Sequence, residues 1–148
     1  MSTFEREDVL SIPAGQSYPC VKANLIHACP TDRKYKPAIY LAFRPEGGEM
    51  DTLYKVDAIF EITPHDKKAI EGLNLRYKER VESYISQRNA ESPFADQGPR
   101  KFYVLSETQQ IDLPHKPKLL QNIQRHCYFK LAELTDGKEI VQVSPQKK

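Results

Sequence analysis

The chain contains no tryptophan and only three cysteines, and no apolar run in it approaches the length of a membrane span. A helix that crosses a bilayer needs roughly 20 apolar residues. The first ten residues carry acidic side chains where a secretory signal needs basic ones. An odd number of cysteines forms no obvious disulfide framework, and free thiols persist in reducing compartments. We therefore expect a cytoplasmic protein with no disulfide scaffold.

The short motifs of common catalytic sites are missing too, since there is no GxSxG elbow, HExxH pair, phosphate-binding loop or dinucleotide fingerprint. Cys20, His27 and Cys29 are a conceivable zinc set, but only His27 and Cys29 are close, and structural zinc sites usually show two close ligand pairs. Cys127 follows His126, but neighbours on a strand point to opposite faces. We expect no cofactor and no bound metal, and a binding module rather than an enzyme, with catalysis left open.

The charged residues are strongly segregated along the chain, although the formal net charge is only +2. Residues 22–44 carry basic side chains against a single acidic one, Asp32. Residues 46–61 are mainly acidic, and residues 100–130 are mainly basic again. Polarised segments can build a cationic face, and such a face selects anionic partners. We expect the basic segments to meet on one rim in the folded protein.

A chain of 148 residues is expected to form one globular domain, here residues 1–148. Residues 1–16 are predicted to be an N-terminal arm or short helix, because residues 2–5 have the spacing of a capping box and Pro13 and Gly15 would end a helix. Residues 144–148 are predicted to be a flexible polar tail.

Two strands and one helix stand out in the first half. Residues 38–44 are mostly apolar and predict a central strand, and residues 53–62 alternate between apolar and polar side chains. A hairpin between these strands is expected. Apolar residues then recur at helical spacing and predict a helix over residues 74–88, after a shorter turn at residues 66–71. Residues 17–29 are predicted to be extended.

In the second half, residues 101–106 and 127–131 are predicted to be strands. Residues 135–138 contain Asp136 and Gly137, a two-residue hairpin signal, with a return strand after them. The pattern as a whole predicts an α+β fold. It would be a small, mostly antiparallel sheet, curled or closed into a barrel, with one or two inserted helices.

Acidic residues on one strand offer a possible catalytic site. Asp57 and Glu61 share the polar face of residues 53–62, and Asp51 precedes them. Carboxylates in this order can hold a divalent metal in nucleases. Those of the restriction-enzyme type also need a lysine two residues after the glutamate, where this chain has Thr63. A solvated strand face explains the same pattern without any chemistry.

Aromatic residues interleaved with cations favour nucleic-acid contact, because cations bind phosphates and rings stack on bases. Tyr35 and His115 are predicted to stack or to form hydrogen bonds, and the basic residues to contact phosphates. The candidate binding residues are Arg33, Lys34, Tyr35, Lys36, Arg44, His115, Lys116 and Lys118. If several phosphates are neutralised, binding should weaken steeply with salt.

Residues 36–44, a glycine turn and residues 53–62 together resemble the strand pair of PUA-like barrels, the group that includes the ASCH and EVE domains. The resemblance implies a pocket that binds RNA or a flipped DNA base, close to residues 30–37 and 114–118. Two alternatives remain. One is a small metal-dependent nuclease using Asp51, Asp57 and Glu61. The other is a protein-interaction subunit of a bacterial or phage system, docking a protein partner through the helix at Tyr77–Ile85.

Overall fold

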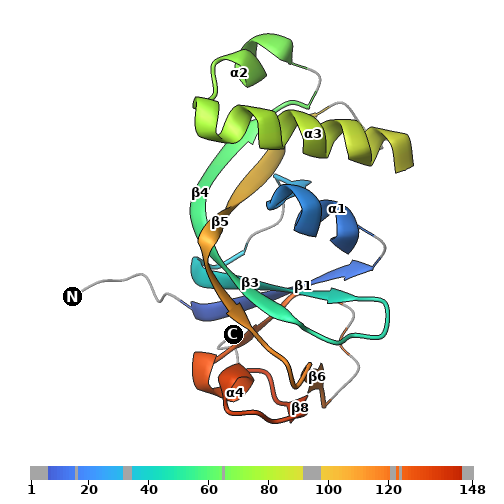
Figure 1. Cartoon of the computed structure of the whole chain (residues 1–148), viewed down its shortest axis with the longest axis vertical. Coiled ribbons are helices and arrows are strands. Elements are labelled where there is room, and N and C mark those ends of the chain that lie inside the picture. The colour runs from blue at the N-terminus through green and yellow to red at the C-terminus, as the bar shows by residue number, and fades with distance from the viewer. Residues whose placement is uncertain are drawn as a thin grey trace, which may run out of the picture. The chain divides into compact units, whose positions relative to one another are not determined.

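The computed structural model describes residues 7–15, 17–31, 35–64, 66–91, 98–120, 123 and 125–144, and leaves the side chains of Glu7 and residues 89–91 undescribed. The chain forms two compact units (Figure 1). Unit 1 comprises residues 1–18, 35–56 and 108–148. Unit 2 comprises residues 19–34 and 57–107. The single domain expected from the chain length stays a prediction.

The main sheet has six strands in the hydrogen-bonded order β2-β5-β4-β3-β1-β7. Strands β4 (Thr52–Ile62) and β5 (Arg100–Asp112) each contribute residues to both units. The order has two ends among the described strands, so the sheet is open rather than a closed barrel. The predicted α+β class with a largely antiparallel sheet is confirmed, although one internal pairing is parallel.

In unit 1, β1 (Glu7–Gly15) lies between two strands from distant parts of the chain. It pairs in parallel with β3 (Ala38–Pro45) and antiparallel with β7 (Cys127–Phe129). The hairpin predicted between residues 38–44 and 53–62 is present, since β3 pairs antiparallel with β4.

Residues 7–15 were expected to be part of an arm or helix and are instead an internal strand. The side chains of Val9, Leu10, Ser11 and Ile12 are all buried. A strand that is buried on both faces shows a run of apolar residues rather than alternation. The run in residues 9–12 is too short to predict a strand from the sequence. The expected capping box at residues 2–5 lies outside the described residues. Of the predicted tail, Ser144 is buried and donates its N–H to the Tyr128 carbonyl at 2.7 Å, and the rest lies outside the description.

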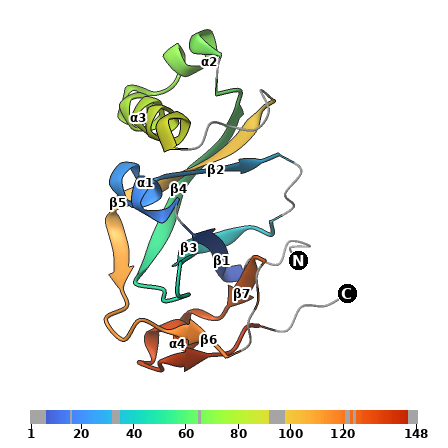
Figure 2. The same cartoon turned by 90° about the vertical axis from the view of Figure 1, so that its right-hand side faces the viewer.

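Unit 1 continues with a small sheet and a short helix, which lie together at the orange-to-red end of the chain (Figure 2). Strand β6 (Lys118–Leu119) pairs in parallel with β8 (Ile140–Val141), and α4 (Leu131–Thr135) precedes β8. The hairpin predicted at residues 135–138 is therefore wrong. Gly137 has φ of 87° and follows the C-cap of α4, so it ends a helix in the left-handed conformation that glycine favours there.

Unit 2 is built from helices packed on the remaining strand segments. It contains most of α1 (Tyr18–Asn24), β2 (Ile26–Pro30), α2 (Lys67–Glu71) and α3 (Leu75–Glu91). Strand β2 pairs antiparallel with the first half of β5. The helix expected over residues 74–88 is confirmed as α3, and the shorter turn expected at residues 66–71 forms the short helix α2. The described residues contain no helix that is both long and apolar enough to cross a membrane.

Residues 17–29 were expected to be an extended segment with an interruption at Pro19, but residues 18–24 form helix α1. Pro19 instead occupies the first helical turn, where the absent N–H leaves no hydrogen bond unmade and the fixed φ suits the helix. Cys20, Val21 and Asn24 then share one buried side of the helix. The Asn24 amide donates to the Cys20 carbonyl at 2.9 Å and to the Gln87 side chain of α3 at 2.7 Å.

Arg80 of α3 holds the end of α1. Its guanidinium donates to the carbonyls of Asn24 at 3.1 Å, Leu25 at 2.8 Å and Leu105 at 2.6 Å. Leu25 has φ of 54°, a conformation that non-glycine residues rarely adopt, so the guanidinium stabilises a strained helix end. Glu107 adds an ion pair at 3.2 Å.

Replacing Arg80 with alanine should therefore destabilise the protein strongly. Three backbone carbonyls each lose the hydrogen bond from the guanidinium, and we expect the free energy of unfolding to fall by about 3 kcal/mol. Arg76→Ala is the matched control, because Arg76 is an exposed residue of the same helix. Urea unfolding followed by circular dichroism measures both variants. Equal losses in the two variants would contradict the role given to Arg80.

His27 of β2 is a second sensitive position in unit 2. Burial, and then the positive charge of Arg88, lower the pKa of His27 to about 4. In the unfolded chain the same imidazole titrates near its ordinary value of 6.5. Between these values the unfolded state takes up a proton that the folded state refuses, so acidification favours unfolding.

The protein should accordingly lose about 1 kcal/mol of stability through His27 between about pH 7.5 and about pH 5.5. The pH range lies above most carboxylate titration. Urea unfolding at several pH values should show this slope for the natural chain and a flatter one for His27→Gln. The same slope in both proteins would show that His27 does not cause it.

Candidate nucleic-acid interface

Two segments of unit 1 that are far apart in sequence form an aromatic–cation cluster, consisting of Tyr35, Lys36, His126 and Tyr128. The ring of Tyr35 meets His126 edge to face, with centroids 4.7 Å apart. His126 meets Tyr128 in the same way at 5.7 Å. The Lys36 ammonium lies 5.7 Å from the centroid of the Tyr128 ring, within the range of a cation–π contact. Edge-to-face rings and a cation over a ring are mutually attractive, so the cluster is self-supporting.

The cluster is anchored through the backbone. The Lys36 N–H donates to the Tyr128 hydroxyl at 2.9 Å, which ties the first segment to β7. Cys127 and Phe129, the alternate residues of β7, pack in the core of unit 1. The period of two along a strand then turns His126 and Tyr128 to the other face. Tyr35, Lys36 and His126 are half-buried, and Tyr128 is buried.

Arg44 of β3 fixes the segment that leads into His126. Its guanidinium donates to the carbonyl of Ile123 at 2.5 Å and to that of Arg125. Only 6% of Arg44 is exposed. Burial lowers the pKa of Arg44 from its ordinary value, and the nearby Cys127 opposes this change. An arginine remains protonated in proteins, so its charge is held inside the unit. This placement favours a structural role rather than the predicted phosphate contact.

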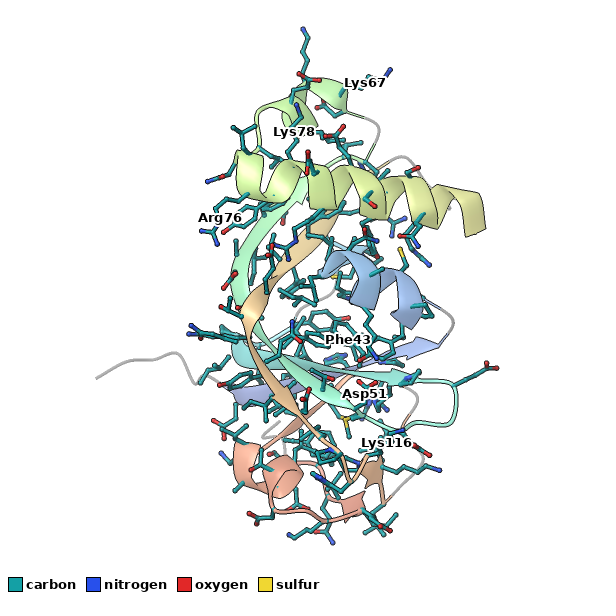
Figure 3. All side chains as sticks on the ribbon, in the orientation of Figure 1. Phe43, Asp51, Lys67, Arg76, Lys78 and Lys116 are labelled. Atoms are coloured by element: carbon teal, nitrogen blue, oxygen red, sulfur yellow. The ribbon has the colours of Figure 1, made fainter. Side chains whose placement is uncertain are left out.

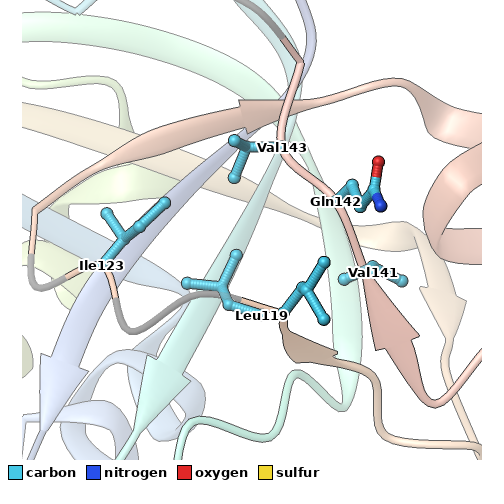
Figure 4. Close-up of a pocket in the computed structure, with 6 residues that line it drawn as sticks. Leu119, Ile123, Val141, Gln142 and Val143 are labelled. Carbon is cyan, nitrogen blue, oxygen red and sulfur yellow. The ribbon is translucent and has the colours of Figure 1, made fainter.

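A cavity of about 510 Å³ opens beside Arg44, and we call it the Arg44 cavity. Lys118 of β6 and the turn between β3 and β4, including Gly47 and Gly48, form its walls. Leu119, Leu120 and Ile123 line both this cavity and a second one of about 230 Å³, which we call the apolar recess. Figure 4 shows the recess, where Val141 and Val143 complete the lining.

The predicted residues of the second basic segment, His115, Lys116 and Lys118, also belong to unit 1, and Lys118 lines the same cavity as Arg44. Nε2 of His115 lies 2.7 Å from the Leu134 carbonyl and must carry the proton of that hydrogen bond, so His115 supports α4. Lys116 is exposed, and Figure 3 labels it. Lys118 is exposed and lies 3.9 Å from Glu49, a loose ion pair. Arg33 and Lys34 lie outside the described residues.

The three carboxylates of the nuclease alternative have different surroundings. Asp51, in unit 1, accepts a hydrogen bond from the Tyr18 hydroxyl, which also lies 2.9 Å from the Tyr54 hydroxyl. Burial, followed by these hydrogen bonds, raises the pKa of Tyr18, so its hydroxyl stays protonated and donates. Asp57 and Glu61 are exposed residues of unit 2. Within the described part of the chain, no three His, Cys, Asp or Glu side chains are grouped to hold a metal ion.

Several other candidate residues from the sequence analysis are buried. Cys20, Cys29 and Cys127 are buried, and burial raises the pKa of Cys127 despite the nearby charge of Arg44. The thiolate that nucleophilic chemistry needs is therefore disfavoured at Cys127. Tyr84 and Ile85 belong to the helix at Tyr77–Ile85, through which a protein partner was expected to dock, and both are buried within unit 2.

The sequence identified Tyr35 and Lys36 but did not select His126 or Tyr128. A signal was present, because Arg125, His126 and Tyr128 place a cation and two rings within four residues, with the rings two positions apart. On a strand that spacing puts both rings on one face.

No model of a known family and no curated protein sequence matches this chain. Among solved structures, the crystal structure of ASCH from Zymomonas mobilis is similar, with a TM-score of 0.53 and 11% identity. The match covers 90% of this chain and 98% of that one. A mutant of the same Zymomonas mobilis protein matches with a TM-score of 0.49 and 13% identity, covering 84% of this chain and 91% of that one.

The chain therefore has an α+β fold that is similar to the fold of the ASCH protein from Zymomonas mobilis. The resemblance to the group of the ASCH domains seen in residues 36–62 is confirmed at the level of the fold. At 11% identity, the similarity concerns the fold alone.

The fork of hydrogen bonds from Arg44 leads to a prediction about stability. Lysine keeps the charge but cannot reach two carbonyls with a planar fork, so Arg44→Lys should lower the free energy of unfolding by about 2 kcal/mol. Arg125→Lys makes the same chemical change at an exposed position and is the control. Urea titration monitored by tyrosine fluorescence compares them. A tolerated Arg44→Lys would mean that the two carbonyls do not depend on the fork.

Proposed function

We propose that the protein is a non-catalytic nucleic-acid-binding module that binds single-stranded RNA on the aromatic–cation cluster. The observation that supports this most is the meeting of Tyr35 and Lys36 with His126 in one place on unit 1. The PUA-like fold agrees with the proposal without establishing it.

The chemistry of the cluster suits an unpaired strand. Tyr35 and His126 are only half-buried, and aromatic rings that solvent can reach stack on bases that are not held in a duplex. Lys36 supplies an ammonium group for a phosphate beside those rings. The sequence places Arg33 and Lys34 directly before Tyr35, and Arg125 directly before His126. These cations would contact phosphates of the RNA before and after the stacked bases.

The other predicted binding residues have supporting roles in this proposal. The exposed Lys116 and Lys118 are further candidates for phosphate contact. Arg44 acts by holding the backbone before His126, and His115 acts by supporting α4. The nuclease alternative gains no support from the described carboxylates, and we do not propose it.

Fluorescence anisotropy with a labelled 12-nucleotide RNA of mixed sequence tests the proposal. Tyr35→Ala should weaken binding by roughly fivefold to tenfold, because a stacking partner is lost, while Tyr35→Phe should keep most of the affinity. Circular dichroism first checks that both variants fold. If the RNA and a single-stranded DNA of the same sequence both fail to bind at about 50 mM KCl, where electrostatic attraction is strong, the proposal is wrong.

The salt dependence of binding gives an independent check on Lys36. Each phosphate neutralised on a single strand contributes about 0.7 to the slope of log affinity against log salt. Lys36→Met should reduce the slope by about that amount. Lys67→Met removes the same charge from an exposed position of α2 and should leave the slope unchanged. A change of equal size in both variants would indicate a general charge effect rather than contact at the cluster.

A further inference from the structure

We propose that the Arg44 cavity and the apolar recess together form a binding site for a small carboxylate with an apolar chain. The two cavities share Leu119, Leu120 and Ile123, so a ligand could place its charged group in one and its apolar part in the other. No residue of the aromatic–cation cluster is among the residues described as lining them, so the site is separate from that cluster.

The Arg44 cavity is positively charged on its described walls. Among the lining residues that the structure describes, Arg44 and Lys118 are basic and none is acidic. Arg44 is nine-tenths buried, and within the described part of the chain its guanidinium is satisfied by carbonyls alone, with Nε lacking any hydrogen-bond partner. A buried charge with no opposite charge beside it is unfavourable, so an anion in the adjacent cavity would be stabilised.

Lys118 supplies the accessible donor. Its ammonium group lies 3.9 Å from Glu49, and both side chains are 48% exposed, so this contact is long and solvated. Exposed ion pairs of this kind contribute little and are readily exchanged. Arg44, Lys118 and Glu49 together carry one net positive charge, which matches a single carboxylate better than a multiply charged phosphate chain.

The turn between β3 and β4 leaves room for the charged group. Gly47 and Gly48 have φ of 92° and 79°, and a Cβ added at either would meet nothing within 4 Å. Positive φ favours glycine here, and the absence of side chains keeps this wall of the cavity open. A volume of about 510 Å³ is within the range of small-molecule sites, roughly 300–1,000 Å³.

The recess provides the apolar part of the site. Apart from Gln142, its lining consists of aliphatic residues, namely Leu119, Leu120, Ile123, Val141 and Val143. Leu120 remains 58% exposed, an unusual state for a large aliphatic side chain next to a cavity. An apolar chain laid along it would remove this surface from water, which is favourable in proportion to the area covered.

Calorimetric titration of the full chain with sodium octanoate tests the site, with acetate and octan-1-ol as probes of each half. Octanoate should bind with one-to-one stoichiometry. Acetate and octanol should each bind at least about tenfold more weakly, equivalent to about 1.4 kcal/mol, because each makes only half of the contacts. Equal binding of octanol and octanoate, or octanoate uptake without saturation, would reject the proposal in favour of general adsorption to apolar surface.

Two variants locate the charged end. Lys118→Met should weaken octanoate binding roughly fivefold to tenfold, as expected when one charge-assisted contact is lost. Lys116→Met removes an exposed charge two residues away that does not line either cavity, and should have no effect. In ¹H–¹⁵N spectra, octanoate should shift the amides of Gly47 and Gly48. Equal effects of the two variants, or shifts confined to other residues, would overturn the assignment. None of these outcomes bears on the RNA proposal, because the tested ligand and the cluster are distinct.

Discussion

The buried guanidinium of Arg44 is the interaction on which both proposed sites of unit 1 depend. It gives two hydrogen bonds to the backbone, one to the carbonyl of Ile123 and one to that of Arg125. On one side of these two residues His126 enters the aromatic–cation cluster, and on the other Leu119 and Leu120 line the cavities. The sequence predicted that Arg44 contacts a phosphate, but in the structure Arg44 is buried and binds two backbone carbonyls. A planar group with several donors can satisfy two carbonyls together.

The cluster itself arises from the same alternation that builds the core. Strand β7 sends Cys127 and Phe129 into the core of unit 1, and this obliges its neighbours to face the other way. The Tyr128 hydroxyl then accepts from the backbone of Lys36 and brings the first basic segment to the strand. Core packing of the short strand β7 therefore sets the positions of His126 and Tyr128, and through them the position of Tyr35.

Strong periodicity made part of the fold predictable. Strand β3 follows its apolar run, with Leu41–Arg44 all buried, while β4 and α3 follow patterns with the period of a strand and of a helix. Helix α1 and the pairing of strand β8 were predicted wrongly, because proline also suits the first turn of a helix and an Asp-Gly pair can also end a helix. In the site, local composition identified Tyr35 and Lys36. The burial of Arg44 and the partnership with His126 are tertiary outcomes that no short window of sequence contains.

Strand β1 has a consequence for how the protein is made. Its parallel neighbour β3 begins at Ala38, but its other neighbour, β7, begins only at Cys127. During synthesis the strand emerges early and one of its edges stays without a partner until most of the chain has followed. Pairings so distant in sequence form slowly and leave unpaired edges open to wrong partners. Nascent chains that stall before residue 127 would thus expose an apolar strand edge, and chaperones that recognise such edges would bind them.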